Sequence, residues 1–309
     1  MKVYNNILEL IGKTPLVELQ KLNYNGKARV FVKLESKNPG GSIKDRPAIK
    51  LLTDAENSNK INQNTTIIEP TSGNTGVGLA LACAVKGYKL ILTMPENMSL
   101  ERRTLLKAYG AELILTPKEK GMQGAVDKAN ELANSIQNSY IPQQFSNPSN
   151  TKAHEISTAE EIIQDTDGQV SIFITSIGTS GTLCGCAKTL KQHNPKIKIF
   201  GIEPETSPLL TKGFSSTHKI QGIGANFIPP IYSPEYIDEI LTINEDIAIQ
   251  TARELATKEG ILCGISSGAN VAKALELAQL EENAGKIIVT IICDTGERYL
   301  SSELYQNEQ

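Results

Sequence analysis

The sequence contains only three histidines and no excess of basic residues, and each of these shortages argues against a class of protein. Its 309 residues carry a net charge of −3. Without a run of lysine and arginine, a charge of this sign speaks against a nucleic-acid partner. The histidines, His154, His193 and His218, are isolated and are not spaced with cysteines or carboxylates as metal ligands. We therefore expect neither nucleic-acid binding nor a metal site.

Long hydrophobic segments are also lacking. The longest apolar stretch, residues 77–94, is interrupted by Lys86, Gly87 and Lys89, so it predicts no membrane span. The first residues lack the apolar run of a signal peptide. The five cysteines are scattered and odd in number, which suits a reducing compartment better than a disulfide framework. These features predict a cytoplasmic protein with no membrane partner.

Short apolar segments alternate with helical ones along the chain. The predicted strands are 29–35, 65–69, 89–94, 111–115, 171–176, 198–203 and 286–292. The predicted helices between them include 77–86, 101–109, 124–135, 152–164, 245–258 and 269–280. Such alternation is typical of α/β proteins with parallel sheets. Segment 204–236 is rich in proline, serine, threonine and glycine, and we expect it to be an irregular loop facing the substrate.

Lys44 lies where the first of these strands passes through turn residues 38–41 into a helix. Ser42 and Asp45 have the spacing of a capping box, but Pro47 would then lie in the helix interior, so Asp45 as the cap is the alternative. In both cases Lys44 lies at a helix N-terminus, whose positive dipole end favours the neutral amine. A neutral lysine amine can form a Schiff base. An ordinary surface lysine is the simpler alternative.

Three further loops also connect a strand to a helix. They are the glycine- and hydroxyl-rich segments 71–76, 178–182 and 264–268. At the carboxyl ends of parallel strands such loops present backbone N–H groups that favour anions, and segment 178–182 suits a phosphate. For any single loop, an ordinary tight turn is the alternative, and none matches a nucleotide-binding fingerprint. Together with Lys44, the three loops indicate a ligand site.

These segments have the order and spacing found in cysteine synthases. They read NPGGSIKDR (38–46), TSGNTG (71–76), GTSGT (178–182) and GISSGA (264–269). The chain thus resembles O-acetylserine sulfhydrylases, which are fold-type II pyridoxal-phosphate enzymes, over nearly its whole length. Segments 97–99, 109–115 and 292–301 are most similar to the bacterial B-type. Ala159 stands where most cysteine synthases have glycine, and in this the chain resembles cystathionine β-synthases.

The resemblance implies an architecture as well as a cofactor. It implies two α/β domains with twisted, mostly parallel sheets flanked by helices, as in the tryptophan synthase β subunit. The larger, cofactor-binding domain would comprise residues 1–41 and 150–309. The smaller, 42–149, would move to close on the substrate carboxylate. The resemblance also implies a homodimer with pyridoxal 5′-phosphate between the two domains of each chain.

Each motif residue acquires a role from the resemblance. Lys44 would hold pyridoxal 5′-phosphate as a Schiff base, Asn74 would hydrogen-bond the ring's 3′ oxygen, and Ser266 would face the pyridine nitrogen. The residues expected to hold the phosphate are Gly178, Thr179, Ser180, Gly181 and Thr182. The residues expected to bind the substrate α-carboxylate are Thr71, Ser72, Thr75 and Gln144.

A serine hydroxyl can donate to a neutral pyridine nitrogen but cannot stabilise a protonated ring as a carboxylate does. This favours loss of a β leaving group, with Lys44 as the general base at Cα. We therefore predict a transferase that makes L-cysteine from O-acetyl-L-serine and sulfide through an aminoacrylate intermediate. Alternatives are a hydrogen sulfide-producing cysteine lyase, a lanthionine or cystathionine β-synthase, and a non-catalytic nucleotide-binding or regulatory α/β protein. Binding of a serine acetyltransferase stays open.

Overall fold

The computed structural model describes residues 3–306, and by its internal contacts the chain divides into two compact units. The smaller unit contains the chain up to Ile11 and Asn38–Asn150, and the larger contains Gly12–Lys37 and the chain from Thr151 onward. The N-terminal segment thus differs from the sequence expectation, which placed 1–41 in the larger domain. The reason is packing: Leu8, in the short 3₁₀ helix Ile7–Leu10, packs against the apolar cluster that includes α2 of the smaller unit.

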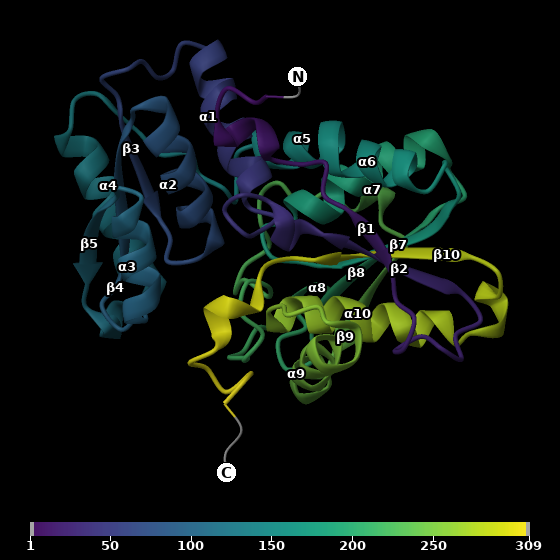
Figure 1. The fold of residues 1–309 in the computed structure, drawn as a ribbon. Coiled ribbons are helices and arrows are strands. Elements are labelled where there is room, and N and C mark those ends of the chain that lie inside the picture. Colours follow the sequence, from purple (N-terminus) through teal and green to yellow (C-terminus); the bar gives the residue numbers. More distant parts are fainter. Residues whose placement is uncertain (1–2, 307–309) are drawn as a thin grey trace. The chain divides into compact units, whose positions relative to one another are not determined.

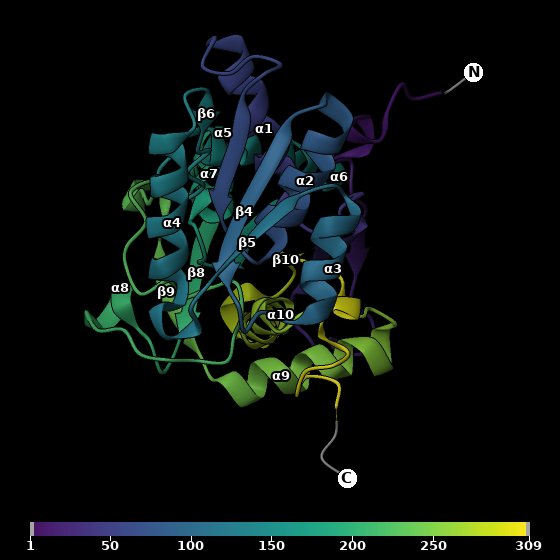
Figure 2. The ribbon, with the colours of Figure 1, turned by 90° about the vertical axis from the view of Figure 1, so that its left-hand side faces the viewer.

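The smaller unit is built on a four-stranded parallel sheet. Its strands, in spatial order, are β5 (Glu112–Thr116), β4 (Lys89–Pro95), β3 (Thr66–Pro70) and β6 (Ser139–Tyr140). Its helices are α1 (Asp45–Asn57), α2 (Asn74–Lys86), α3 (Leu100–Ala108) and α4 (Gly121–Ser135). Helix α4 covers one face of the sheet, and α2 and α3 lie over the other (Figure 2).

Both faces of this sheet are buried, which explains the nearly unbroken apolar strands. Neighbouring residues of β3 point to opposite faces: Ile67 packs in the cluster with α1 and α2, whereas Ile68 packs with Ala129 of α4. Helix α2 ends at Lys86, as the predicted helix 77–86 does, and Gly87 caps it with a left-handed backbone (φ 80°).

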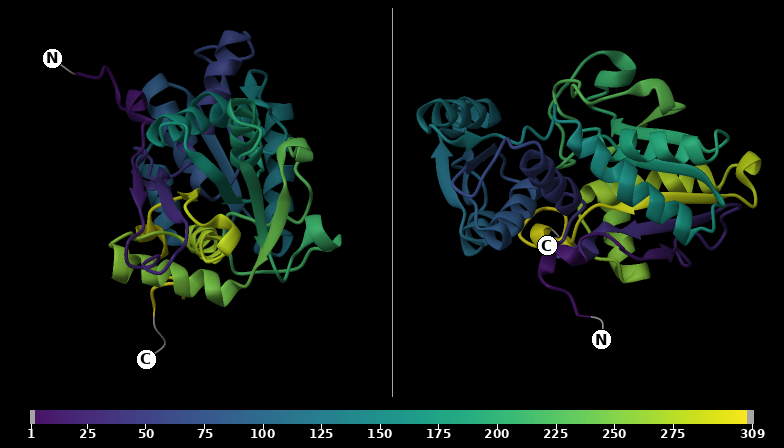
Figure 3. Two further views of the ribbon diagram at one scale, coloured as in Figure 1. Left: turned by 90° about the vertical axis from the view of Figure 1, so that its right-hand side faces the viewer. Right: turned by 90° about the horizontal axis from the view of Figure 1, so that it is seen from above.

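The larger unit contains a six-stranded sheet. Its strands, in spatial order, are β1 (Leu16–Glu18), β2 (Arg29–Leu34), β10 (Ile287–Ile292), β7 (Val170–Ser176), β8 (Lys198–Pro204) and β9 (Glu239–Ile243). Among these six strands, β1 pairs antiparallel with β2, and the other four pairings are parallel. The main helices are α6 (Ala159–Asp165), α7 (Gly181–His193), α9 (Glu245–Glu254) and α10 (Ile265–Ala278). Figures 1 and 3 show α6 and α7 on one face of the sheet and α9 and α10 on the other.

Two predicted segments have more structure than their patterns suggest. The predicted helix 152–164 consists of α5 (Ser149–Ala153), a π turn at His154–Thr158 and α6. The predicted irregular loop 204–236 contains the one-turn helix α8 (Leu209–Lys212) and a 3₁₀ turn at Pro234–Tyr236. None of the helices in residues 3–306 has the length and apolar composition needed to span a bilayer.

Candidate active site

The substrate loop predicted at 71–76 leads from β3 into α2 in the smaller unit. The Thr71 N–H donates to the Thr93 carbonyl (3.1 Å), and the Gly73 N–H donates to Thr71 Oγ1 (3.3 Å). Helix α2 then begins at Asn74 after an extended Gly73. The loop is therefore held compactly at the carboxyl end of the sheet, where parallel α/β proteins bind ligands.

Lys44 is the residue directly before α1, so its predicted place at a helix N-terminus is confirmed. Neither predicted cap forms, however. The Ser42 hydroxyl accepts from the Lys44 N–H (3.2 Å), and the Asp45 carboxylate accepts from the Gly40 N–H. Pro47 is the third residue of the helix and lies in its first turn, where a missing N–H costs little.

Gly78 allows the start of α1, next to Lys44, to pack closely against α2 beside the loop 71–76. A Cβ at this position of α2 would lie 2.9 Å from the Ala48 Cβ and 3.0 Å from the Lys44 carbonyl oxygen. Helices α1 and α2 therefore cross at Gly78, and a larger side chain would force them apart. The backbone of Lys44 consequently lies beside the first turns of α2, whose first residue is Asn74.

Gln144 is brought to the same end of β3 from far along the chain. Its side-chain Oε1 accepts from the Thr75 hydroxyl at 2.6 Å. Thr71, Thr75 and Gln144 are each less than 10% exposed. The predicted carboxylate-binding residues thus surround the N-terminus of α2, which favours an anion.

The predicted phosphate loop, 178–182, follows β7 in the larger unit. Ser180 has a left-handed backbone (φ 72°) and directly precedes α7. Its hydroxyl oxygen is buried and has no hydrogen-bond partner within residues 3–306. Gly178 is needed because a Cβ there would lie 2.3 Å from the Gly222 carbonyl oxygen. An orphaned hydroxyl beside a helix N-terminus fits a phosphate group.

Ser266 lies on the same edge of the larger sheet, as the second residue of α10, and is 5% exposed. Asn270 of the same helix accepts from the Ser176 N–H (2.7 Å) at the end of β7 and donates to the Ile291 carbonyl (2.8 Å) in β10. These bonds fix the start of α10 relative to the strand that leads into the phosphate loop.

The residues of the two units therefore fit pyridoxal phosphate in chemical type. The smaller unit supplies a primary amine and amide and hydroxyl groups at one helix start. The larger unit supplies the unpartnered Ser180 hydroxyl for a phosphate and the Ser266 hydroxyl for a ring nitrogen.

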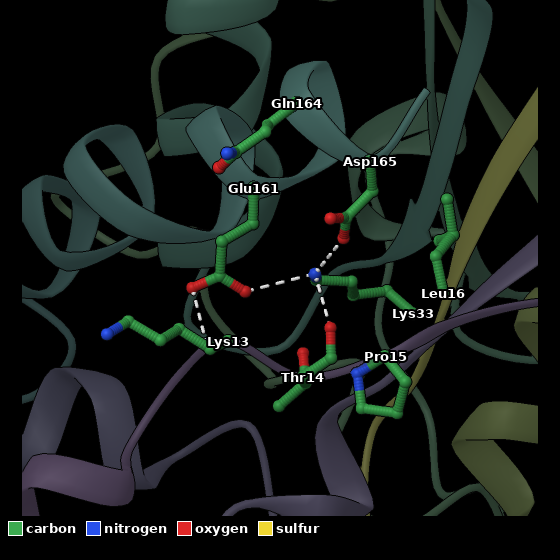
Figure 4. Close-up of a pocket in the computed structure, with 8 residues that line it drawn as sticks. All are labelled: Lys13, Thr14, Pro15, Leu16, Lys33, Glu161, Gln164 and Asp165. Atoms are coloured by element: carbon green, nitrogen blue, oxygen red, sulfur yellow. Dashed lines mark hydrogen bonds and ion pairs between the residues drawn. The ribbon is translucent and has the colours of Figure 1, made fainter. Parts of the chain in front are cut away.

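Lys33 shows that charge in a strand does not always mean exposure. Lys33 lies in the predicted strand 29–35 and is completely buried. Its amine contacts the Thr14 carbonyl (2.6 Å), Asp165 (2.6 Å) and Glu161 (3.0 Å), as Figure 4 shows. Three partners occupy its three N–H donors, so it is a structural ion pair and not a nucleophile.

These groups line a pocket of about 430 Å³ in the larger unit (Figure 4). The lining residues are Lys13, Thr14, Pro15, Leu16, Lys33, Glu161, Gln164 and Asp165. None of them was predicted as a site residue. The pocket opens beside the short strand β1, whose pairing the sequence pattern does not reveal.

Four of the five cysteines are buried, and Cys293 is partly exposed. Cys184 and Cys186 of α7 are buried, and burial raises the pKa of the Cys184 thiol to about 11. A thiol of this kind is not a nucleophile near neutral pH. Within residues 3–306, no three His, Cys, Asp or Glu side chains are grouped as metal ligands.

A family model described as pyridoxal-phosphate dependent enzyme matches residues 7–294. The chain belongs to this family. Its predicted family and cofactor, pyridoxal phosphate, are thereby confirmed, and the chain is a pyridoxal-phosphate-dependent enzyme.

Known proteins share both sequence and fold with the chain. It is 52% identical over 305 residues to cysteine synthase B of Campylobacter jejuni, covering 99% of this chain and 100% of that protein. The crystal structure of a cysteine synthase from Entamoeba histolytica superposes with a TM-score of 0.97 at 45% identity, covering 100% of this chain and 92% of that one. A hydrogen sulfide-producing enzyme from Fusobacterium nucleatum superposes with a TM-score of 0.93 at 46% identity, covering 97% and 99%. The predicted fold-type II architecture is confirmed.

Proposed function

We propose that this enzyme makes L-cysteine from O-acetyl-L-serine and sulfide in the cytoplasm. The observation that carries this proposal is the 52% identity to a cysteine synthase over 99% of the chain. All four motifs with proposed roles lie within residues 7–294, which the family model matches, and each begins or precedes a helix.

The residues of both units serve one cofactor molecule in this proposal. Lys44 holds it covalently through its amine, and Asn74 and Ser266 hydrogen-bond its ring. Gly178, Thr179, Ser180, Gly181 and Thr182 hold its phosphate. When bound, the cofactor withdraws electrons from Cα of the substrate.

The substrate carboxylate binds at the start of α2, to Thr71, Ser72, Thr75 and Gln144. Because Gln144 Oε1 accepts from Thr75, the amide NH₂ is the part of this side chain that donates to the carboxylate. Helix N-terminal N–H groups add further donors. This arrangement orients the amino acid with its Cα toward Lys44.

Lys44 also moves the proton. Once the substrate amino group has replaced it on the cofactor, the free Lys44 amine takes the proton from Cα. Acetate leaves from Cβ, a hydrosulfide ion adds at Cβ, and the proton returns to Cα. Closure of the smaller domain, residues 42–149, on the substrate carboxylate would exclude water during these steps.

A comparison of two reactions tests the proposal. Cysteine formation from O-acetylserine and sulfide is measured beside cystathionine formation from cysteine and homocysteine. We expect the first to have the higher kcat/KM. A much faster second reaction would overturn the proposal.

Release of hydrogen sulfide from L-cysteine is a second candidate function. It is supported by the 46% identity and TM-score of 0.93 to the hydrogen sulfide-producing enzyme of Fusobacterium nucleatum. The same groups could bind cysteine and remove its Cβ substituent. Sulfide released from L-cysteine alone, measured against the rate of cysteine synthesis, decides between the two directions.

We further propose that the enzyme is a homodimer. Light scattering of the purified enzyme during size-exclusion chromatography should give twice the chain mass of 33.5 kDa. Co-purification with a serine acetyltransferase would test the remaining partner that the resemblance leaves open.

A further inference from the structure

Glu69 is a buried carboxyl group for which the sequence motifs suggest no role. It lies in β3, directly before the last residue of that strand, and is 2% exposed. Its Oε2 accepts from the Gln143 N–H (3.2 Å) and its Oε1 from the Gln144 N–H (3.4 Å). A buried carboxyl is unfavourable without such bonds, so both contacts matter for its presence in the core.

Gln143 has an unusual backbone. Its φ of 58° lies in the left-handed region, which residues other than glycine adopt only when neighbouring contacts hold them there. Its carbonyl accepts from the Ser146 N–H (3.0 Å) and the Asn147 N–H (2.9 Å), so the chain turns sharply at this point. The Glu69 carboxyl group accepts hydrogen bonds from the Gln143 and Gln144 N–H groups of this turn.

The turn determines where Gln144 points. Its N–H donates to Glu69, its carbonyl accepts from Asn150 Nδ2 (2.8 Å), and its side-chain Oε1 accepts from Thr75 (2.6 Å). The backbone and the side chain of Gln144 are therefore both fixed, with the amide NH₂ left to donate. Pre-organised donors of this kind bind a ligand with less loss of conformational entropy.

We propose that Glu69 is a positioning residue for the substrate α-carboxylate. By holding the left-handed turn at Gln143, it keeps the Gln144 amide in the orientation that binds this carboxylate. The inference rests on the proposed function, because it assigns the carboxylate to Gln144. A purely structural Glu69 would affect stability and leave substrate affinity unchanged.

The substitution Glu69→Gln tests the proposal in the holoenzyme. It preserves the size of the side chain but places an NH₂ group against a backbone N–H. We expect the KM for O-acetylserine to rise about tenfold, as the loss of one charge-assisted hydrogen bond predicts. The kcat and the KM for sulfide should change less than about twofold, because neither depends on how tightly Gln144 binds the substrate α-carboxylate.

Two substitutions at Gln143 make the test specific to the turn. Glycine adopts a positive φ readily, so Gln143→Gly should restore most of the affinity that Glu69→Gln removes. Valine adopts a positive φ poorly, so Gln143→Val should raise the KM for O-acetylserine with Glu69 intact. The Gln143 side chain is exposed, so the Gln143→Val variant keeps the test decisive even where Glu69→Gln fails to fold.

The matched control is Glu56→Gln in the same unit. Glu56 pairs with Lys86 (2.8 Å) and accepts from the Tyr88 hydroxyl (2.9 Å), so its contacts lie at the C-terminal end of α2. The KM of the Glu56→Gln variant for O-acetylserine should equal that of the wild type. If the wild type turns over O-acetylserine, and Glu69→Gln and Gln143→Val both have the wild-type KM for it, the inference is overturned. A wild type that turns over L-cysteine but not O-acetylserine would instead overturn the proposed function, and the KM comparison would then use L-cysteine.

Discussion

Ser180 combines two unfavourable features at the start of α7. A non-glycine residue holds a left-handed backbone (φ 72°), and its buried hydroxyl has no partner within residues 3–306. Strained backbone and unsatisfied polar groups each lower stability by about 1–3 kcal/mol. Features of this kind are expected at ligand sites, where a bound group supplies the missing interaction.

Replacing Ser180 with glycine should separate stability from cofactor binding. Glycine tolerates a positive φ and removes the orphaned hydroxyl, so the cofactor-free Ser180→Gly variant should be more stable by about 1 kcal/mol. Its Kd for pyridoxal phosphate should rise several-fold, because one hydrogen bond to the phosphate is lost. Chemical denaturation and cofactor titration measure the two effects, and an unchanged Kd would argue against a phosphate at this loop.

Lys44→Ala should abolish turnover without unfolding the protein. The amine is the proposed covalent and proton-transfer group, so kcat should fall by at least about 10³-fold. Lys50→Ala is the matched control, since Lys50 lies in α1, which Lys44 directly precedes, and pairs with Asp54 four residues on. Circular dichroism should be unchanged in both variants, and normal turnover by Lys44→Ala would exclude its assigned role.

Glu69 should make stability depend on pH. Burial raises the pKa of its carboxyl from 4.5 to about 7, against the opposing effect of the two backbone N–H groups. A raised pKa means that the folded protein binds this proton more tightly than the unfolded chain. The stabilisation is therefore complete below pH 4.5 and is lost as the pH rises through 7. The neighbouring Tyr140, whose pKa is raised chiefly by burial, stays neutral throughout this range.

The variant Glu69→Gln has no such proton to lose. The unfolding free energy of Glu69→Gln minus that of the wild type should therefore increase by up to about 3 kcal/mol as the pH rises from 5 to 8. Urea denaturation at both pH values measures this difference. A difference that does not change with pH would show that Glu69 titrates near its ordinary pKa.

At the scale of elements, the sequence predicted best where long apolar segments end in glycine-rich turns. Strands β4 and β7 lie at their predicted places, because their apolar signals are local. Helices α2 and α10 begin at Asn74 and Ile265, three and four residues before the predicted starts at 77 and 269, because the glycine-rich turns already form their first turns. Strands β1, β6 and β9 were not predicted, since two to five residues show little periodicity and their pairing comes from tertiary contacts.

The burial of charged side chains could not be predicted from the sequence either. Charged and apolar residues alternate along β2, a pattern typical of a strand with one exposed face. However, β2 lies inside the sheet between β1 and β10, and Glu161 and Asp165 of α6 neutralise Lys33. Glu69 was missed for a similar reason, because its partners at 143–144 lie more than 70 residues along the chain. The motif residues were recognisable because each lies at a local strand-to-helix turn.

The crossing of α1 and α2 should be sensitive to a single methyl group. In Gly78→Ala, the new Cβ would lie 2.9 Å from the Ala48 Cβ and 3.0 Å from the Lys44 carbonyl oxygen. We expect a loss of about 1–3 kcal/mol in unfolding free energy and a fall in kcat, because α1 carries Lys44 away from the substrate loop. Val85→Ala, on the exposed side of α2, should leave kcat unchanged. Wild-type kcat in Gly78→Ala would show that Lys44 does not depend on this crossing.

For the whole molecule, the proposed function requires both units to bind one cofactor. Lys44 and Asn74 belong to the smaller unit, whereas the phosphate loop and Ser266 belong to the larger one. Neither unit contains all the groups needed to hold the ring and the phosphate. Activity should therefore depend on a cofactor that contacts segments more than 100 residues apart in the chain.

Hydrogen exchange of the enzyme with and without pyridoxal phosphate tests this dependence. A ligand bound by both units slows local opening in each of them. Amides in 71–76 and in 178–182 should therefore both gain protection on cofactor binding, with equal dependence on its concentration. Strand β9, at the far edge of the larger sheet, serves as the internal control and should exchange at the same rate in both states. Protection confined to 178–182 would mean that the larger unit binds the phosphate alone, and Lys44 would then have no part in holding the cofactor.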